Sequence, residues 1–374
     1  MKRSDIKLKK RWVVKVGSAL LTNEGRGLHE GMLKTLAQQI SFLRSQDIEV
    51  LLVSSGSIAA GVSQLKLPTR PTKLNELQAA AAVGQAALVR AYENVFKPQG
   101  IQIAQILLTH ADIANRERYL NAKGTLLSLL DLDVLAIINE NDSVANEEIC
   151  FGDNDSLAAL LTNLVYADLL VLLTDQNGLY SADPRSNPDA TLIEQANAND
   201  ENLKELASGG GAWGSGGMLT KLSAAQIASR SGASTIIANG RQEAILKNLY
   251  EGENQGTLLN ASDRLSSKKQ WLAGQMHISG LVVIDSGAEK VLRQAGRSLL
   301  PVGVVSFEGE FKRGELISCR NEQGDEVARG LVNYSSEELH KLKGQASERI
   351  SDLLGYGGED ELIHRDNLVM IEKA

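Results

Sequence analysis

Short aliphatic runs alternate with longer amphipathic or alanine-rich stretches through about residue 250. The aliphatic runs contain few polar residues, which is typical of parallel strands that are covered on both faces. We expect strands at 12–16, 48–53, 101–108, 134–138, 168–173 and 234–238. We expect helices at 29–46, 73–97, 115–130, 154–166, 217–231 and 241–250. The alternation predicts an α/β fold, a three-layer αβα sandwich around a mainly parallel sheet.

The pattern changes after about residue 252. Residues 252–270 are polar and rich in Gly, Asn and Ser, so they predict a linker or a traversing loop. Strand-like runs follow at 281–285, 302–307, 315–319 and 326–334, with helical patterns at 287–296 and 336–354. These short runs predict a small, mainly β barrel that is partly closed. The domain limits that we expect are 1–258 for the α/β domain, 259–276 for a linker, 277–358 for the β domain and 359–374 for a C-terminal extension that packs on it.

Composition and charge narrow the possible partners. The 374 residues include 39 Lys/Arg and 46 Asp/Glu, a net charge of −7, with 43% hydrophobic and 23% charged residues. This is the balance of a globular protein, and the negative charge does not favour broad binding to nucleic acid or to an anionic membrane. From Met276 to Ala374, 12 Lys/Arg stand against 17 Asp/Glu, a net charge of −5. We therefore expect no nucleic-acid partner for the β domain, because nucleic-acid modules normally show a basic surface.

Nothing in the chain predicts a membrane or secreted protein. The basic start, MKRSDIKLKKR, is followed by an apolar run that Lys15 interrupts, so we expect a solvated basic tail and not a secretory signal. No stretch approaches the roughly 20 apolar residues of a membrane span. The two cysteines, Cys150 and Cys319, are far apart in sequence, and the five histidines lack the spacing of a zinc site. These features predict a cytoplasmic protein without a dedicated metal site.

Polar segments follow several of the predicted strands, at the edge where open parallel sheets bind ligands. Lys15 lies near the end of the first strand, and Gly17 follows that strand, so an ammonium and a glycine amide could both approach a phosphate there. The second strand ends in the Ser-Ser-Gly-Ser sequence of 54–57, which precedes an alanine-rich helical start. Small residues at a helix N-terminus favour an anion site, although a capping serine or a surface lysine would account for each segment by itself.

Two further segments add an acidic pocket and a glycine-rich loop. Residues 138–161 crowd carboxylates and amides between a strand and a helix, which suits an ammonium-bearing substrate, an orienting Asp and outer contacts to Mg²⁺. Thr174 and Asp175 end another strand, and the later loop 209–221 holds six glycines and ends on Lys221. The loop suits a polyphosphate but is not a Walker A motif. Together the segments indicate phosphoryl transfer from a nucleotide.

These motifs resemble those of the amino-acid kinase superfamily, and most closely those of the glutamate 5-kinase family. The matching segments run in order through nearly the whole chain: KVGS (15–18), SSGSIAAG (54–61), INENDSV (138–144), FGDNDSLAAL (151–160), LLTDQNGLYSADPR (172–185), GGMLTK (216–221) and SLLPVG (298–303). The C-terminal module resembles the PUA domain that bacterial members of this family carry.

The resemblance implies ATP-dependent phosphorylation of the γ-carboxylate of L-glutamate, the first step of proline biosynthesis, with proline as an inhibitor. It implies Mg²⁺ bound with the ATP phosphates, and a homo-oligomer, either a dimer or a tetramer. It implies a catalytic set of Lys15, Asp155 and Lys221. The implied glutamate ligands are Ser55, Gly56, Asp142 and Asn154. The implied ATP ligands are Lys15, Gly17, Thr174, Asp175, Ser215, Gly216, Gly217, Met218, Leu219, Thr220 and Lys221.

Other activities stay open at this point. An aspartate kinase or an N-acetylglutamate kinase would share much of the motif set, but Asp142 favours a substrate with a free α-ammonium, which an acetylated amine lacks. A UMP kinase would have no clear use for the acidic segment. PUA modules elsewhere bind RNA, so an RNA-binding protein with a kinase-like core is a hypothesis of another class. The net charge of −5 over 276–374 argues against it.

Overall fold

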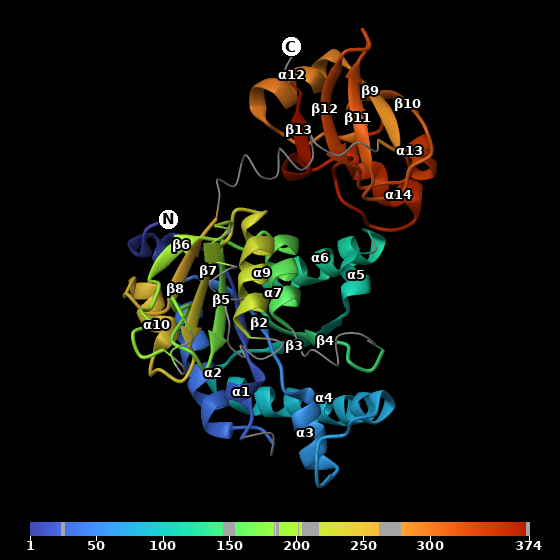
Figure 1. Cartoon of the computed structure of the whole chain (residues 1–374). Helices are drawn as coiled ribbons and strands as arrows, with labels where there is room; N and C mark the ends of the chain where they lie inside the picture. Colours follow the sequence, from blue (N-terminus) through green and yellow to red (C-terminus); the bar gives the residue numbers. More distant parts are fainter. Residues whose placement is uncertain are drawn as a thin grey trace. The chain divides into compact units, whose positions relative to one another are not determined.

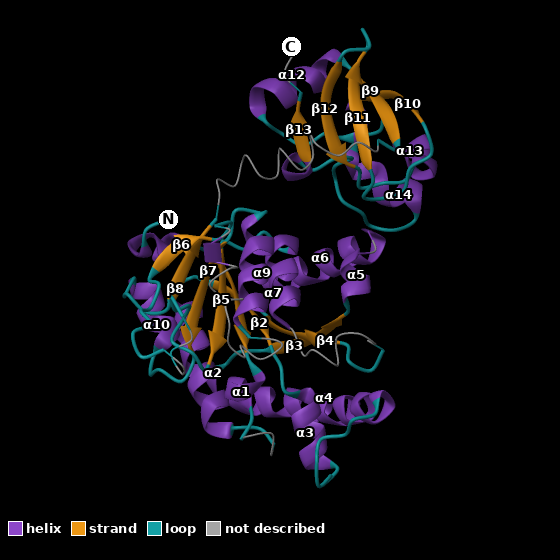
Figure 2. Cartoon of the chain, viewed as in Figure 1, coloured by secondary structure: helices purple, strands orange, loops and turns teal. Residues whose placement is uncertain are grey.

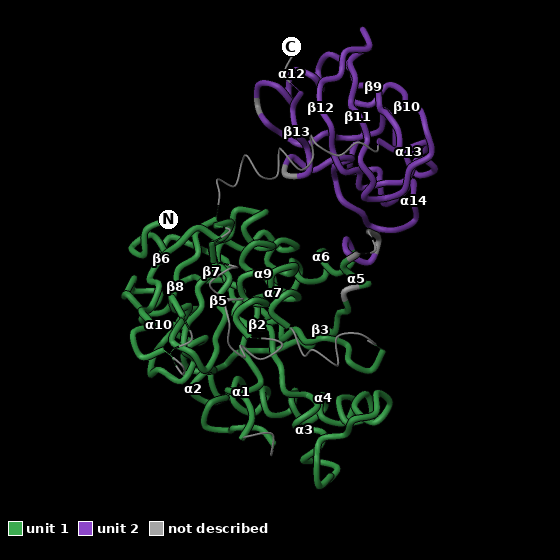
Figure 3. The backbone as a smooth tube through the Cα atoms, viewed as in Figure 1, with its two compact units in different colours: residues 1–114, 121–264 green, residues 115–120, 265–374 purple. Residues whose placement is uncertain are grey.

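The computed structural model describes residues 1–23, 27–114, 116–144, 154–182, 184, 187–200, 202–203, 217–261 and 278–371. The chain divides into two compact units (Figure 3). The first comprises Met1–Ala114 and Asn121–Arg264, and the second comprises Asn115–Leu120 and Leu265–Ala374. No helix within the described ranges is long and apolar enough to cross a lipid bilayer.

Within the described residues of the first unit, eight strands form one sheet in the order β3-β4-β2-β1-β5-β7-β8-β6 (Figure 1). They are β1 (Arg11–Val16), β2 (Glu49–Val53), β3 (Ile103–Leu108), β4 (Leu135–Glu140), β5 (Leu169–Thr174), β6 (Gln195–Asn197), β7 (Ser234–Asn239) and β8 (Thr257–Asn260). Neighbouring strands pair in parallel, except that β7 and β8 are antiparallel. All six strands expected from the aliphatic runs are present.

Helices cover both faces of this sheet (Figure 2). They are α1 (Ser18–Leu21), α2 (Glu30–Ser45), α3 (Ser57–Gln64), α4 (Leu74–Phe96), α5 (His110–Ala114), α6 (Arg116–Asp131), α7 (Asn154–Leu164), α9 (Met218–Ser229) and α10 (Ile245–Glu251), with the short 3₁₀ helices η1 (Arg3–Leu8) and η2 (Lys97–Gln99). Helices α2, α4 and α10 share one apolar cluster with the sheet, while α7 and α9 pack on each other and on β5. The predicted three-layer αβα sandwich is confirmed.

Strand β1 lies at the centre of the sheet and is buried along nearly its whole length. Trp12, Val14 and Val16 belong to the apolar cluster that contains α2 and α4. Because side chains alternate along a strand, Val13 and Lys15 face the opposite layer, the one formed by α7 and α9. A charged side chain at the end of this aliphatic run is therefore directed at the first turns of two helices.

The interpretation of the residues after 252 as a linker or traversing loop is wrong for its first part. Thr257–Asn260 forms strand β8, which pairs with both β7 and β6, so Leu259 and Asn260 of the expected linker belong to the sheet. Leu258 and Leu259 are fully buried. Two leucines between polar residues are too short a run to reveal a strand, because pairing with β7 supplies what the local sequence lacks.

The expected solvated tail at the N-terminus is also wrong. Residues Arg3–Leu8 form η1, and Ile6 is fully buried in the apolar cluster. The guanidinium of Arg3 donates to the backbone carbonyls of Gln255 and Gly256, at 2.7 Å each, and of Glu194, at 2.8 Å. Composition alone does not distinguish an arginine that donates to several backbone carbonyls from an arginine that is surrounded by water.

The second unit contains a smaller sheet. Within the described residues, five strands lie in the order β10-β9-β11-β12-β13. The elements are β9 (Gly280–Ile284), α12 (Ser286–Ala295), η3 (Pro301–Gly303), β10 (Val304–Glu308), β11 (Leu316–Asn321), β12 (Glu326–Leu331), α13 (Ser336–Leu342), η4 (Ser347–Arg349), α14 (Ile350–Leu354), η5 (Arg365–Asn367) and β13 (Leu368–Met370). Four of these strands match the predicted runs, whereas the short β13 was not predicted. It pairs antiparallel with β12.

Helices α3 and α4 of the first unit pack against each other (Figure 1). They approach closely because glycines lie at the crossing. A Cβ atom on Gly61 would lie 1.7 Å from the carbonyl oxygen of Ala80. A Cβ atom on Gly84 would lie 1.8 Å from the carbonyl oxygen of Ser57. Both neighbours are backbone atoms, which cannot rotate away. Helix α4 therefore determines where α3 begins, directly after the serine-rich turn that follows β2.

We predict that Gly84→Ala lowers the free energy of unfolding by about 2 kcal/mol, because the added methyl forces the two helices apart. Urea denaturation measures the effect. The matched control is Gly124→Ala in α6, where an added Cβ meets no atom within 4 Å. That substitution should stabilise the protein by about 0.5–1 kcal/mol, since alanine is the better helix former. Equal stability of the Gly84→Ala variant and its parent would contradict the close crossing.

Candidate functional site

Two lysines and one aspartate, which are far apart in sequence, meet above the carboxyl end of β1. Asp155 lies in the first turn of α7, and Lys221 lies in the first turn of α9. The Nζ of Lys15 is 2.6 Å from Oδ1 of Asp155, and the Nζ of Lys221 is 2.9 Å from Oδ2. The three side chains expose only 8%, 11% and 2% of their surface, for Lys15, Lys221 and Asp155 respectively. Each lysine thus has its own oxygen of a single buried carboxylate.

The start of α9 is attached to the same carboxylate by a neutral group. The hydroxyl of Thr220 lies 3.0 Å from Oδ2 of Asp155 and 3.0 Å from the carbonyl oxygen of Gly217. Lys221 also donates to that carbonyl, at 3.3 Å. These contacts tie the first turn of α9 to the first turn of α7. The carbonyl of Gly217, directly before α9, is therefore held by two side chains of that helix's first turn.

The lysines determine the charge of Asp155. Burial by itself raises the pKa of a carboxyl group, but the ammonium groups of Lys15 and Lys221 outweigh it and lower the pKa of Asp155 to about 2. Asp155 is therefore ionised at neutral pH. One carboxylate between two ammonium groups leaves one positive charge in excess at a buried position. Such a cluster at the mouth of a parallel sheet attracts an anion.

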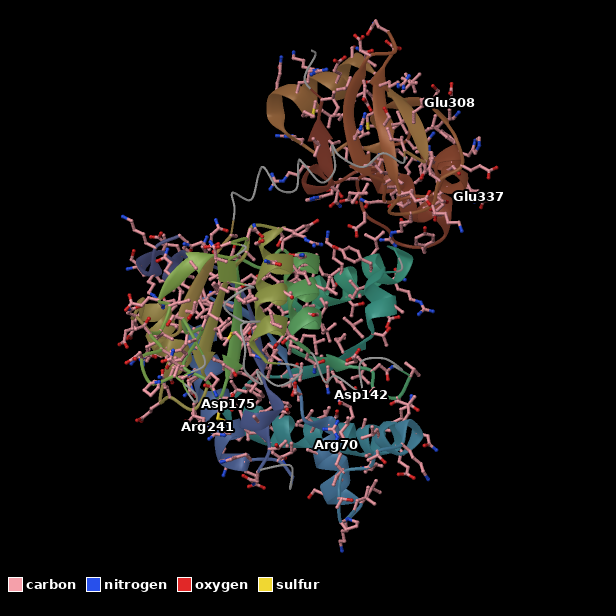
Figure 4. All side chains as sticks on the ribbon, in the orientation of Figure 1. Arg70, Asp142, Asp175, Arg241, Glu308 and Glu337 are labelled. Atoms are coloured by element: carbon pink, nitrogen blue, oxygen red, sulfur yellow. The ribbon has the colours of Figure 1, made fainter. Side chains whose placement is uncertain are left out.

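The residues predicted to bind glutamate come together on one side of this cluster. Gly56 precedes α3 with φ +92°, a left-handed conformation that favours glycine, and Ser55 is buried beside it. The side-chain amide of Asn154 donates to the Ser54 carbonyl at 2.6 Å and approaches the Ser55 hydroxyl at 3.2 Å. The hydroxyl of Ser57 donates to Asp142 at 2.8 Å. Asp142, labelled in Figure 4, thus joins the loop after β4 to the turn after β2.

The predicted ATP ligands that the structure describes lie around the ends of β1, β5 and α9. Thr174 is the last residue of β5, and its hydroxyl donates to Asp175 at 3.2 Å. Asp175 is exposed, and Figure 4 labels it together with Arg241 from the loop after β7. These loops are neighbours, because the N–H of Gly240 donates to the Thr174 carbonyl at 2.8 Å. They form an exposed polar rim at this end of the sheet.

The remaining predicted ATP ligands differ in their hydrogen bonding and in their burial. The N–H of Gly17, expected to approach a phosphate, donates instead to the carbonyl of Leu173 at 3.2 Å. Met218 is buried, whereas Leu219 leaves 42% of its surface exposed. Ser215 and Gly216 lie outside the described residues. Gly17 can therefore contribute a close approach to a ligand but not this N–H.

Sequence reasoning missed a layer of polar residues beneath the predicted glutamate ligands. Gln85 on α4 accepts a hydrogen bond from the amide of Asn139, at 2.8 Å. Two helical turns further along α4, the hydroxyl of fully buried Tyr92 lies 2.8 Å from that of Ser54. The seven-residue spacing, which places Gln85 and Tyr92 on one face of the helix, is the only local signal. Nothing in the segment indicates what that face contacts.

Comparison with known proteins identifies two domains in the chain. Residues 10–239 match the model of the amino acid kinase family, and residues 280–354 match that of the PUA domain. The glutamate 5-kinases of Pseudomonas putida and Hahella chejuensis are each 55% identical to this chain over 371 residues. These alignments cover 99% of this chain and, respectively, 100% and 96% of the relatives.

The chain belongs to the glutamate 5-kinase family. Its resemblance to that family, drawn from the motifs, is confirmed, and the chain is a kinase with a C-terminal PUA domain. The glutamate 5-kinase of Methylococcus capsulatus is 53% identical over 370 residues, which are 98% of this chain and 99% of that relative. Among solved structures, a UMP kinase from Bacillus anthracis aligns at 17% identity with a TM-score of 0.48, covering 68% of this chain and 97% of that one.

The Asp155 ion pairs of this glutamate 5-kinase family member generate a prediction about pKa. In the double variant Lys15→Met/Lys221→Met, burial acts on Asp155 without the two ammonium groups. The pKa of Asp155 should therefore rise from about 2 to above its ordinary value of 3.8. Carboxyl ¹³C NMR titration of parent and variant measures this shift. A pKa that stays near 2 in the double variant would show that the lysines do not cause the depression.

The higher pKa of Asp155 in the double variant reverses the pH dependence of its contribution to stability. In the parent, the depressed pKa stabilises the folded state above about pH 4, and that contribution is lost as the pH falls towards about 2. In the double variant the raised pKa makes the contribution of Asp155 grow as the pH falls. Lys247→Met, on the exposed surface of α10, is the control and should leave the pKa of Asp155 unchanged.

Proposed function

We propose that this chain catalyses the ATP-dependent phosphorylation of the γ-carboxylate of L-glutamate, giving γ-glutamyl phosphate and ADP. The observation that carries the proposal is the pairing of Lys15 and Lys221 on the buried carboxylate of Asp155. The cluster is adjacent to the predicted ligands of both substrates. The names of the relatives, glutamate 5-kinases, support the same reaction.

The reaction needs no general base. A glutamate side chain has an ordinary pKa of about 4.3, so its carboxylate is already ionised at neutral pH. One carboxylate oxygen forms a bond to the γ-phosphorus of ATP. The bond from that phosphorus to the bridging oxygen breaks, and the electron pair leaves with ADP. No proton is transferred, so the main barrier is electrostatic: an anion must approach a polyanion.

In the proposed mechanism Lys15 and Lys221 contact the transferred phosphoryl group and stabilise its negative charge in the transition state. Asp155 organises the two lysines and contacts neither substrate directly. Because the donors are already held within 2.9 Å of Asp155, little reorganisation is needed when the charge develops. Two positive charges on one carboxylate keep the cluster cationic, which an approaching phosphate requires.

We assign the acceptor side to Ser55, Gly56, Asp142 and Asn154. The carboxylate of Asp142, held by Ser57 at 2.8 Å, suits the α-ammonium of a free amino acid. An N-acetylated substrate offers no such cation, and a nucleoside monophosphate would meet like charge there. These features favour glutamate over the substrates of N-acetylglutamate and UMP kinases. Aspartate differs from glutamate by one methylene, so trapping of the acyl phosphate with hydroxylamine distinguishes these two substrates.

We assign the nucleotide side to Gly17, Thr174, Asp175 and the segment 215–221. The proposed Mg²⁺ binds with the phosphates of ATP, where it neutralises part of their charge. Both oxygens of Asp155 already contact lysines, and the described part of the chain contains no group of three His, Cys, Asp or Glu residues able to hold a metal. This donor set fits an ion that arrives with the nucleotide.

The wider setting of the reaction is also part of the proposal. We infer that it is the first step of proline biosynthesis in the cytoplasm, that proline inhibits it, and that the chain assembles as a homodimer or homotetramer. We retain the domain limits of 1–258, 259–276, 277–358 and 359–374, apart from the strand residues Leu259 and Asn260. For the PUA domain we propose a structural or regulatory role without RNA, because of its net negative charge.

We predict that Lys221→Met lowers kcat at least about 100-fold, because the transition state loses one of its two cationic donors. The fold should persist, since Asp155 stays paired with Lys15 at 2.6 Å. ADP release with saturating glutamate measures kcat, and circular dichroism checks the fold. Lys247→Met is the matched control and should have the parental kcat, because that lysine lies on the exposed surface of α10. Parental turnover in Lys221→Met would contradict the assigned role.

The substrate is tested by trapping the product with hydroxylamine. An acyl phosphate reacts with hydroxylamine to give a hydroxamate, which is measured by its coloured iron complex. With ATP and Mg²⁺, we expect hydroxamate from L-glutamate and at least about tenfold less from aspartate or N-acetylglutamate. Preferential hydroxamate formation from aspartate or N-acetylglutamate would overturn the proposed function in favour of that other small-acid kinase.

A further inference from the structure

A chain of side-chain amides connects helix α4 to a predicted glutamate ligand. Asn139 donates through Nδ2 to Oε1 of Gln85, at 2.8 Å. Asn154 donates through Nδ2 to Oδ1 of Asn139, at 2.9 Å. Asn139 is 1% exposed and Asn154 is 7% exposed, so this part of the chain is shielded from water. Because water does not reach these amides, a hydrogen bond that is lost here leaves a buried polar group unsatisfied, which is destabilising.

Backbone groups at both ends determine which way each amide faces. The carbonyl of Ser54 can only accept, so the amide nitrogen of Asn154 must face it, as observed at 2.6 Å. The N–H of Glu140 can only donate, so Oδ1 of Asn139 must face it, at 3.0 Å. The nitrogen of Asn139 then points at α4, where only an acceptor satisfies it. Gln85 supplies that acceptor.

This orientation has a consequence for the substrate. The amide nitrogen of Asn154 is committed to protein acceptors, and no group among the described residues donates to its Oδ1. Asn154 therefore presents an acceptor oxygen, the same polarity that the carboxylate of Asp142 offers. Two acceptors suit a ligand that carries donor hydrogens, such as an ammonium group, and disfavour a carboxylate.

Helix α4 is a rigid support for this arrangement. The residue before Gln85 is Gly84, which is packed so closely on α3 that an added Cβ would lie 1.8 Å from the carbonyl oxygen of Ser57. Tyr92, on the same face, contacts the Ser54 hydroxyl at 2.8 Å. The position of Gln85 relative to the serine-rich turn is thus determined by packing as well as by hydrogen bonds.

We propose that Gln85 is a positioning residue for the acceptor amino acid. It orients Asn139, and through it Asn154, so that an acceptor oxygen faces the α-ammonium of the substrate. Gln85 contacts neither substrate. This inference rests on the proposed function, because it takes glutamate as the ligand of Asn154. It assigns to Gln85 an effect on affinity for glutamate and not on the phosphoryl transfer itself.

The test compares two substitutions of similar size. Gln85→Met removes the acceptor and leaves the buried nitrogen of Asn139 unsatisfied, so the KM for glutamate should rise about tenfold. Gln85→Glu keeps an oxygen that accepts the same bond, so the KM for glutamate should stay within about threefold of the parent. In both variants kcat and the KM for ATP should change less than about twofold. Gln38→Met, at an exposed site on α2, is the control and should match the parent.

Isothermal titration of glutamate into the full-length enzyme without nucleotide provides a readout that does not depend on turnover. The Kd for glutamate should follow the same order, with the parent and Gln85→Glu close together and Gln85→Met about tenfold weaker. An unchanged KM and Kd in Gln85→Met would overturn the proposal. So would equal weakening in Gln85→Met and Gln85→Glu, or a parallel rise in the KM for ATP with a lower melting temperature, which indicates a general structural role.

If the proposed function were wrong, the measurements would differ from those expected if only the Gln85 proposal were wrong. The parent enzyme would then neither bind glutamate nor give its hydroxamate, whereas failure of the Gln85 proposal leaves both intact in the parent. The two conclusions are therefore decided by separate measurements on parent and variant.

Discussion

Like charges must be brought together wherever an enzyme places two lysines against one phosphoryl group. Two unit charges about 4 Å apart repel each other by about 4 kcal/mol in surroundings with an effective dielectric constant of 20. Here the buried carboxylate of Asp155 offsets that repulsion by giving one oxygen to Lys15 and the other to Lys221. The lysines in turn keep the carboxylate ionised in spite of its burial. The mutual attraction of the three groups thus offsets the cost of burying their charges.

The sheet and helices of the first unit bring these three side chains together. Strand β1 is central in the sheet, and its alternation directs Lys15 towards the layer of α7 and α9. Both of these helices begin at the same edge of the sheet, so Asp155 and Lys221 arrive from their first turns. The residues assigned to glutamate are positioned in another way, by the close crossing of α3 and α4 at Gly61 and Gly84. The cationic centre thus depends on sheet topology, and the proposed acceptor pocket depends on helix packing.

The sequence predicts best those features that have a local cause. Aliphatic runs identify the central strands because burial on both faces removes polar residues, and Lys15 stands out as the charged residue near the end of such a run. Prediction from the sequence fails where pairing or packing with distant residues decides the local structure. Strand β8 contains only two leucines and exists because β7 and β6 flank it. The amide contact between Gln85 and Asn139 joins positions 54 residues apart, and no spacing rule connects them. The locations of the predicted ligands were accessible from sequence, whereas the residues that orient them were not.

The central claim is that Asp155 acts on the chemical step by holding two lysines, and not by binding either substrate. Rapid-quench single-turnover kinetics of Asp155→Asn, with enzyme in excess over ATP, measures that step directly, and isothermal titration gives the two substrate affinities. We predict a rate constant for phosphoryl transfer at least about 100-fold below that of the parent, with affinities for glutamate and ATP within about threefold. A single-turnover rate constant close to that of the parent, or a loss confined to substrate affinity, would contradict the claim.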